Sequence, residues 1–335
     1  MFNKKSILIT GGTGYFGRNF VKHLLDNYSP LKIVVFSRDE QKQYQLQNKF
    51  KEHKKKDILR FFIGDIRDQS RLSMAFDGID IVVHAAALKH VPATEYNPME
   101  CVKTNILGAQ NIIEASLNNN IKKVVALSTD KAANPINIYG ASKLVSDKLF
   151  VAANNLTGKK KISFSVVRYG NVFGSTGSVV PFFKSIAESG DTIFPITDRK
   201  MTRFIITIKE GIDFVVKALK EMKGGEVFIP KIPSMRIVDL AEAISKKNSI
   251  KVIGIRPGEK LHEVLCPKDS AHLTLEFKDY YIITPSILFY GKKNIFIKNN
   301  SGEEGKKVPT NFEYNSEGND DFLPVNTIKK MLNKI

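Results

Sequence analysis

The chain of 335 residues contains only two cysteines, Cys101 and Cys266, and they show no paired spacing. A disulfide framework and a zinc site are therefore not expected, and the sequence fits a reducing compartment. No group of His, Cys and carboxylate residues has metal-ligand spacing either, so we predict no bound metal.

Long apolar runs are also lacking. The longest, residues 81–87, is interrupted by His84 and falls far short of a bilayer span. The apolar run near the start, residues 6–9, is too short for the core of a signal peptide. We therefore expect a cytoplasmic protein with no membrane partner.

Acidic residues are scarce beside basic ones, with 34 against 51 and a net charge of +17. Such a charge suggests a nucleic-acid partner. However, the lysine runs 54–56 and 159–161 lie in polar connections without interleaved aromatic residues. We predict instead a solvated basic surface that attracts anionic small molecules, and no nucleic-acid partner.

Short apolar segments alternate with helical patterns along the first two thirds of the chain. We expect strands at residues 6–10, 32–36, 59–63, 80–84, 124–127, 162–168 and 226–229. The most prominent helices are expected at residues 98–117, 139–155 and 210–222. This alternation predicts an α/β fold, a doubly wound parallel Rossmann sheet with a smaller C-terminal substrate-binding domain.

The expected domains follow from where the alternation loosens. We assign residues 1–170 plus about 205–230 to a dinucleotide-binding domain. Residues 171–204 and 231–335 form the substrate-binding domain. The polar tail, residues 299–321, is expected to be loosely ordered or to pack as an arm.

A glycine-rich turn follows the first expected strand. Gly11, Gly14 and Gly17 suit a tight turn, close approach of the backbone to a pyrophosphate, and close helix–strand packing. The helix that follows then directs its N-terminus at the phosphates. The spacing predicts a dinucleotide site, in which Thr13, Tyr15 and Phe16 also take part.

The end of the second strand bears on which dinucleotide binds. Ser37 and Arg38 come first there, and Lys42 follows one helical turn later. Arginine suits a ribose 2′-phosphate, so the sequence favours NADP. Asp39 leaves NAD open, because an acidic residue at this place holds a free ribose hydroxyl.

Two further strand ends add candidates for the cofactor site. After the third strand, Asp65 is placed to accept a hydrogen bond from the adenine amino group; alternatively, it caps the helix that begins near Ser70. After the fourth strand, the small residues Ala85 and Ala86 let a cofactor lie against the backbone, and Lys89 reaches phosphate or sugar.

The most informative stretch is residues 128–143. Tyr139 and Lys143 share one face of a helix, where an ammonium lowers the pKa of a phenol and favours a general base. Thr129, Asp130 and Lys131 lie at the carboxyl end of a strand, where open α/β sheets place their chemistry. The alternative for the last two is an Asp that caps a helix and a solvated Lys.

With these motifs the chain resembles the extended short-chain dehydrogenase/reductase family. More narrowly, it resembles the inverting UDP-N-acetylglucosamine 4,6-dehydratases of pseudaminic acid synthesis. Retaining sugar-nucleotide dehydratases carry Asp-Glu where this chain has Asp130 and Lys131, and capsule-type inverting relatives often lack the tyrosine. The resemblance rests on residues 10–17, 37–40, 85–92, 127–143, 168–174, 195–204, 230–235 and 255–263.

The resemblance implies roles for particular residues. Tyr139 and Lys143 match the catalytic pair with Thr129 as hydroxyl partner, and Asp130 and Lys131 match the dehydration acid and base. Further implied cofactor contacts are Ile66, Leu127, Ser128, Val172, Phe173 and Gly174. Implied contacts to the sugar nucleotide are Lys89, Asn171, Val179, Thr197, Thr202, Arg203, Arg256 and Glu259. Thr176 stands where relatives often have arginine, which weakens any phosphate contact there.

The implied substrate is UDP-N-acetylglucosamine, which is oxidised at C4, loses water between C5 and C6, and is reduced again with inversion at C5. The implied assembly is a homo-oligomer, a dimer or a hexamer. Lys131 must be neutral to act as a base, and burial and Asp130 push its pKa in opposite directions. Two alternatives remain: a nucleotide-sugar 4-epimerase, and a catalytically silent NADP-binding regulator or nucleic-acid-binding protein on the same fold.

Overall fold

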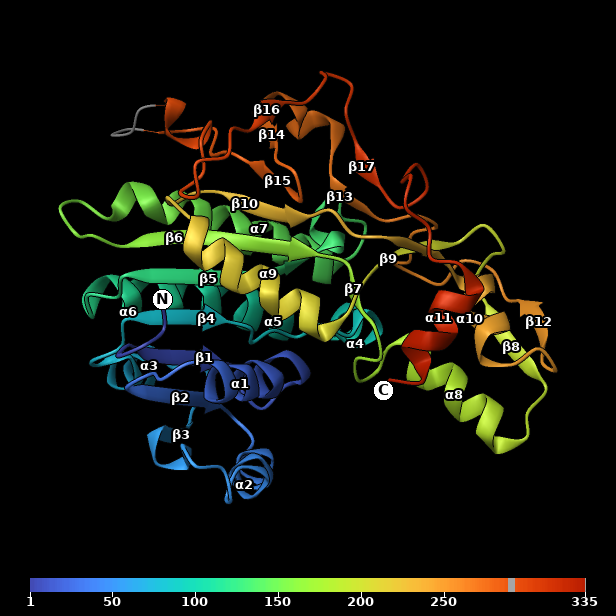
Figure 1. Cartoon of the computed structure of the whole chain (residues 1–335), viewed down its shortest axis with the longest axis horizontal. Helices are drawn as coiled ribbons and strands as arrows, with labels where there is room; N and C mark the ends of the chain where they lie inside the picture. Colours follow the sequence, from blue (N-terminus) through green and yellow to red (C-terminus); the bar gives the residue numbers. More distant parts are fainter. Residues whose placement is uncertain (289–292, 335) are drawn as a thin grey trace.

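The computed structural model describes residues 1–288 and 293–334. Its centre is a ten-stranded sheet of order β16-β14-β15-β10-β6-β5-β4-β1-β2-β3 (Figure 1). The strands from β3 to β10 pair in parallel, whereas β15, β14 and β16 add antiparallel pairs at one edge. The bounds are β1 (Ser6–Thr10), β2 (Lys32–Ser37), β3 (Leu59–Ile63), β4 (Ile81–His84), β5 (Lys123–Thr129), β6 (Ser163–Tyr169), β10 (Val227–Pro230), β14 (Thr274–Glu276), β15 (Tyr280–Ile283) and β16 (Lys306–Lys307). The predicted doubly wound sheet is confirmed, with an antiparallel extension that the sequence did not predict.

Helices cover both faces of this sheet, which explains why most of its parallel strands are nearly continuous apolar runs. On one face α1 (Tyr15–Asn27) packs beside α9 (Ile208–Glu221). On the other face lie α3 (Gln69–Phe76), α6 (Gly108–Asn118) and α7 (Ile138–Ala152). Next to the sheet edge, α2 (Glu40–Lys49) follows β2.

The single helix expected at residues 98–117 is interrupted. Beyond α4 (Val91–Tyr96), the chain forms α5 (Pro98–Cys101), a π-helical turn at Val102–Leu107, and then α6. The π turn contains Asn105, whose buried amide bonds both backbone groups of Leu88 and the hydroxyl of Ser142. The irregular turn therefore ties the loop after β4 to helix α7.

A second hydrophobic core lies beyond the carboxyl ends of the parallel strands (Figure 1). It is built on α8 (Val179–Ser189), α10 (Ile237–Ile244), α11 (Val325–Leu332) and the strand pair β8 (Ile193–Ile196) and β12 (Ser249–Val252). A three-stranded sheet links this core to the main sheet: β7 (Asn171–Val172), β9 (Thr202–Ile206) and β11 (Ser234–Arg236).

The proposed domain limits remain a prediction. Strands β14 and β15, from the range 231–335, are part of the main sheet. Residues 289–292 and 335 of the same range lie outside the described residues.

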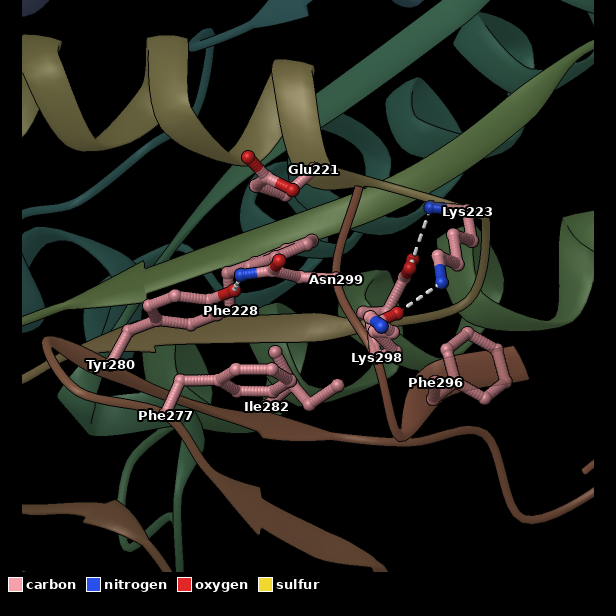
Figure 2. A pocket seen from close by; sticks show the side chains of 10 residues that line it. Glu221, Lys223, Phe228, Phe277, Tyr280, Ile282, Phe296, Lys298 and Asn299 are labelled. Atoms are coloured by element: carbon pink, nitrogen blue, oxygen red, sulfur yellow. Dashed lines mark hydrogen bonds between the residues drawn. The ribbon is translucent and has the colours of Figure 1, made fainter. Parts of the chain in front are cut away.

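The polar tail packs as an arm, the second of the two predicted possibilities. Its strand β16 pairs with β14, and β17 (Tyr314–Asn315) pairs with β13 (Val264–Cys266). Where the arm begins, Asn299 donates a hydrogen bond to the hydroxyl of Tyr280 across a small cavity that α9, β10 and β15 also line (Figure 2). This cavity includes none of the predicted site residues.

Across residues 1–288 and 293–334, no helix combines the length and apolar character needed to cross a membrane. Within the same ranges, no cluster of three or more His, Cys, Asp or Glu side chains is placed to hold a metal ion.

A buried ion pair connects the sheet to the helix that carries Tyr139. Arg168 in β6 lies 3.0 Å from the carboxylate of Asp147 in α7, and both side chains are at most 5% exposed. The hydroxyl of Ser128 donates to the same carboxylate, and Arg168 also donates to the carbonyl of Leu265. The pair therefore fixes β5, β6, α7 and β13 relative to one another.

Replacing this arginine should cost considerable stability. Arg168→Met keeps much of the apolar volume but leaves Asp147 as an unpaired buried charge, so we expect the free energy of unfolding to fall by about 3 kcal/mol or more. Lys209→Met breaks an exposed ion pair with Asp213 and should leave the unfolding midpoint in urea unchanged. Equal midpoints for the two variants would show that the buried pair does not support the fold.

Candidate active site

The candidate site lies at the carboxyl ends of the central parallel strands. The sheet order reverses direction between β1 and β4, and a crevice at such a switch point is where doubly wound sheets bind their ligands. Strands β5 and β6 pair in parallel with Thr129 opposite Tyr169, so both strands end on this side of the sheet. The predicted cofactor turn and the predicted catalytic stretch therefore meet at one edge of the sheet.

The glycine-rich turn packs tightly against the loop after β4. Gly11 has a φ of +65°, and a Cβ at this residue would lie 2.9 Å from the Cα of Ala86. A Cβ at Gly17 would lie 2.5 Å from the carbonyl oxygen of Gly11. Helix α1 starts after Gly14 with no side-chain cap, so the N–H groups of its first turn, from Tyr15 on, are left for an anion. These residues fit the pyrophosphate of a dinucleotide.

A buried histidine supports this cofactor loop. The hydroxyl of Thr10 accepts hydrogen bonds from the backbone N–H groups of Ala85 and Ala86. Its own proton is then free to be donated to Nδ1 of His84, 2.8 Å away, which requires a neutral imidazole protonated on Nε2. Burial, with a smaller contribution from Lys143, lowers the pKa of His84 to about 3.

At the end of β2 the polar groups are arranged around Ser37. Gln43 donates to its carbonyl and its hydroxyl, which fixes the strand end. Arg38 is about half exposed and lies 3.7 Å from Asp65. The carboxylate of Asp39 caps helix α2 and pairs with Lys42 at 2.8 Å, so it is already engaged in the structure.

Asp65 does not cap the following helix. Its carboxylate accepts from the backbone and side chain of Arg67, whereas Asp68 caps α3. The alternative role of Asp65 as a helix cap is therefore wrong, because Asp68 has that role. The neighbouring Ile66 is buried, and its carbonyl accepts from Asn111.

In the dehydration pair predicted from the sequence, the Asp is buried and the Lys is partly buried. Residues Asp130–Ala132 form a 3₁₀ turn that Thr129 caps, and the Thr129 hydroxyl donates to Oδ1 of Asp130 at 3.0 Å. The side chain of Asp130 is 1% exposed and that of Lys131 is 23% exposed, with Nζ 3.1 Å from the same Oδ1. The alternative of a capping Asp and a solvated Lys is therefore wrong.

Helix α7 brings Tyr139 beside this turn. Its cap, Asn137, accepts from the backbone N–H of Gly140, and a Cβ at Gly140 would lie only 2.2 Å from the carbonyl oxygen of Lys131. This close contact needs glycine. Lys143 follows one turn later and is buried.

The pKa of Tyr139 differs from the sequence-based expectation. Burial raises it to about 12, although Lys131 and a hydrogen bond with Thr129 act in the opposite direction. Burial also lowers the pKa of Lys143. The expectation that Lys143 lowers the pKa of the phenol is therefore corrected: desolvation outweighs the neighbouring charges, and Lys131 is the strongest of the charges that oppose it.

The pKa of Lys131 is the result of opposing effects. Desolvation lowers it, but the carboxylates of Asp130 and Glu263 outweigh desolvation, and the net pKa lies above the ordinary value. Glu263 lies 3.1 Å from Nζ and is 2% exposed. Sequence reasoning missed Glu263, because a single Glu in a connecting segment carries no signal that it folds back onto this turn.

A second charged group forms around Glu259. Its carboxylate accepts from Thr197 at 2.6 Å and from Arg256 at 2.5 and 3.0 Å, and Arg203 lies 3.7 Å away. The structure therefore brings together four of the predicted sugar-nucleotide contacts. A fifth of these eight predicted contacts, Thr202, is buried, and its hydroxyl is bonded to His262 and Ser316.

The remaining predicted residues lie on several elements of the fold. Lys89 donates to the carbonyl of Thr176, the residue that stands in place of arginine. Asn171 and Val172 form β7, and Val179 begins α8. Phe173 is buried in the second core and Gly174 has a φ of +71°, whereas Leu127 and Ser128 lie in β5. The roles of these residues remain predictions.

Comparisons with known proteins show the family to which the chain is related. A family model described as polysaccharide biosynthesis protein matches residues 7–285. The chain is 57% identical over 319 residues to a Campylobacter jejuni protein named UDP-N-acetylglucosamine 4,6-dehydratase (inverting), covering 95% of this chain and 94% of that protein. It is 40% identical over 290 residues to a Rickettsia conorii protein named UDP-glucose 4-epimerase, covering 84% of each. The solved structure of Pen from Bacillus thuringiensis is similar with a TM-score of 0.88 and 34% identity, covering 100% of this chain and 98% of that one.

The buried histidine should make stability depend on pH. Because the pKa of His84 is about 3 in the folded chain and near 6.5 when unfolded, the unfolded state binds the extra proton as pH falls through this window. Between pH 7 and pH 5 the wild type should lose about 2 kcal/mol more unfolding free energy than His84→Gln. Urea unfolding at the two pH values measures this difference. Parallel losses in both proteins would show that His84 is not held neutral.

Proposed function

Because the chain belongs to the polysaccharide biosynthesis protein family of extended short-chain dehydrogenases/reductases, we propose that it is a UDP-N-acetylglucosamine 4,6-dehydratase that inverts C5. The observation that carries the proposal is the ion pair of Asp130 and Lys131 beside Tyr139, because the loss of water needs an acid and a base next to the residue that deprotonates the 4-hydroxyl. The relative named for this reaction supports the same assignment.

Tyr139 begins the reaction by taking the proton of the sugar 4-hydroxyl. Lys131 already opposes the effect of burial on the phenol, and Lys143 lies one turn along the same helix face. When bound, the oxidised cofactor NADP⁺ would supply the acceptor for the hydride from C4, and its reduced form would supply the donor for C6. The ketone that Tyr139 helps to create makes the C5 proton acidic, so the next step needs a base at C5.

Asp130 and Lys131 hold between them the one proton that the loss of water requires. Moving it from Nζ of Lys131 to Oδ1 of Asp130, over 3.1 Å, converts an ion pair into a neutral amine and a carboxylic acid. Lys131 then removes the C5 proton, and Asp130 protonates the departing 6-hydroxyl. A proton delivered to C5 from the opposite face inverts that centre.

The cofactor we propose is NADP. Asp39, which would bind the ribose hydroxyl of NAD, is engaged as the cap of α2 and as the partner of Lys42. Arg38 is half exposed at the same strand end, and the hydroxyl of Ser37 lies beside it in sequence. A 2′-phosphate suits this set better than a hydroxyl does.

We further propose that the reaction opens pseudaminic acid synthesis for flagellin or surface glycans, in the cytoplasm and in a homo-oligomer. The resemblance of residues 127–143 to that branch supports this assignment.

The main rival is a nucleotide-sugar 4-epimerase, which the Rickettsia relative is named. An epimerase leaves C5 and C6 unchanged and needs no acid–base pair there. The structure nevertheless holds Lys131 against the buried carboxylate of Asp130, a costly arrangement that a proton-transferring step at C5 and C6 would use. A catalytically silent regulator is disfavoured for the same reason.

Product analysis tests the function directly. With UDP-N-acetylglucosamine and trace NADP, the product should be lighter by one water in mass spectrometry, and NMR should show the inverted C5. An unchanged mass with an epimerised C4 would identify an epimerase instead.

Lys131→Ala should still bind NADP but form no dehydrated product, because the base at C5 is gone. Turnover within a few-fold of the wild type would exclude Lys131 as that base.

Arg38 tests the cofactor. Arg38→Ala should weaken NADP binding by about tenfold or more, because a charged hydrogen bond to the 2′-phosphate is lost, and should change NAD binding little. Lys49→Ala, at the far end of helix α2, is the matched control and should alter neither affinity. Calorimetric titration of the three proteins gives the dissociation constants, and equal losses for both cofactors would argue against a 2′-phosphate contact.

A further inference from the structure

The ammonium of Lys131 lies between two carboxylates, not one. Nζ is 3.1 Å from Oδ1 of Asp130 and 3.1 Å from Oε1 of Glu263. Asp130 follows β5 at the edge of the sheet, whereas Glu263 precedes β13, far along the chain. The proposed reaction uses Asp130 and leaves Glu263 without a role.

Glu263 is held firmly in its place. Its backbone N–H donates to the hydroxyl of Ser316, and its carbonyl accepts from the backbone N–H of Ser316, a residue of the C-terminal arm. Its side chain is 2% exposed, and Oε2 has no hydrogen-bond partner among the described residues. A buried carboxylate with one unpartnered oxygen is costly unless a nearby cation balances its charge, and Lys131 is the nearest cation.

The surroundings of Lys131 show what this charge opposes. Nε of Arg203, on β9, lies 3.8 Å from Oε1 of Glu263. Lys260, in the loop before β13, is near enough that Glu263 and Lys131 act in opposite directions on its pKa, which burial lowers. Tyr139 on α7 and Asp130 on the 3₁₀ turn complete the groups that face the amine. Without Glu263, Asp130 would be the one carboxylate within ion-pair distance of Lys131 among the described residues.

We propose that Glu263 is a positioning residue for the dehydration step: it fixes Nζ of Lys131 opposite Asp130 and keeps on this pair the single proton that the step consumes as an acid. The inference rests on the proposed function and adds to it a residue from the C-terminal part of the chain. Its chemistry requires no proton beyond the one already shared. Glu263 balances Arg203 and Lys260, so that this proton is not driven into solvent.

Glu263→Gln tests the proposal, because it keeps the size and one acceptor oxygen but removes the charge. The midpoint of the Lys131 amine should fall by about one to three pH units, because an opposite charge within ion-pair distance is lost. The midpoint is read from the Cε signal of ¹³C-lysine-labelled protein, assigned by its absence in Lys131→Arg.

The same change should appear in catalysis. The alkaline limb of kcat for the loss of water should move to lower pH together with the amine midpoint, because the pair loses its proton earlier. The KM for UDP-N-acetylglucosamine should stay within about threefold, since Glu263 acts through Lys131. Glu263→Asp should restore part of both shifts. Glu221→Gln, at a buried glutamate bonded to Ser301 in another part of the fold, should cause neither.

Other outcomes would contradict either the role of Glu263 or the proposed function. An unchanged amine midpoint, or a loss of activity that is equal at every pH, overturns the role of Glu263 and leaves only a structural one. A raised KM at unchanged kcat overturns it in favour of a substrate contact. If the wild-type protein releases no water from the substrate, the proposed function fails, and the amine titration still decides whether Glu263 controls the Lys131 proton.

Discussion

One ammonium group, Nζ of Lys131, joins the two parts of the chain that make the active site. Asp130 approaches it from the end of β5, and Glu263 approaches it from the segment before β13. Burying three charges costs several kcal/mol for each ion, and only close geometry offsets this cost. The site therefore depends on how well the C-terminal segments pack on the sheet, and the buried pair of Arg168 and Asp147 beneath it fixes the helix that carries Tyr139.

The sequence was sufficient wherever the chemistry was local. The strand ends at Thr10, Ser37 and Thr129 were placed within about two residues, because apolar runs in a parallel sheet stop where turn residues begin. The glycine-rich turn was also readable, since Gly11 needs a positive φ and Gly17 needs the absence of a Cβ. Turns and caps are short-range features, so the sequence pattern contains them directly.

Long-range features were not readable in the same way. The pairing of β14 with β16 and the contact of Glu263 with Lys131 join distant segments, and no residue spacing in the sequence predicts these contacts. The sequence does not predict the raised pKa of Tyr139, because a sequence pattern shows which charges lie nearby but not how far the phenol is removed from water. The sequence also does not show that Asp68 caps α3 in place of Asp65, because both are aspartates in the same turn. What the sequence lacked was mainly information on burial.

Ser316 bonds the backbone of Glu263 on both sides and also bonds the hydroxyl of Thr202. The alignment of the C-terminal arm along β13 thus reaches as far as the acid–base groups. A one-residue shift of β17 along β13 would move Ser316 away from this contact and bring a neighbouring side chain there instead. The register of the arm and the geometry of the catalytic turn are therefore linked through one serine, although the two segments share no sequence motif.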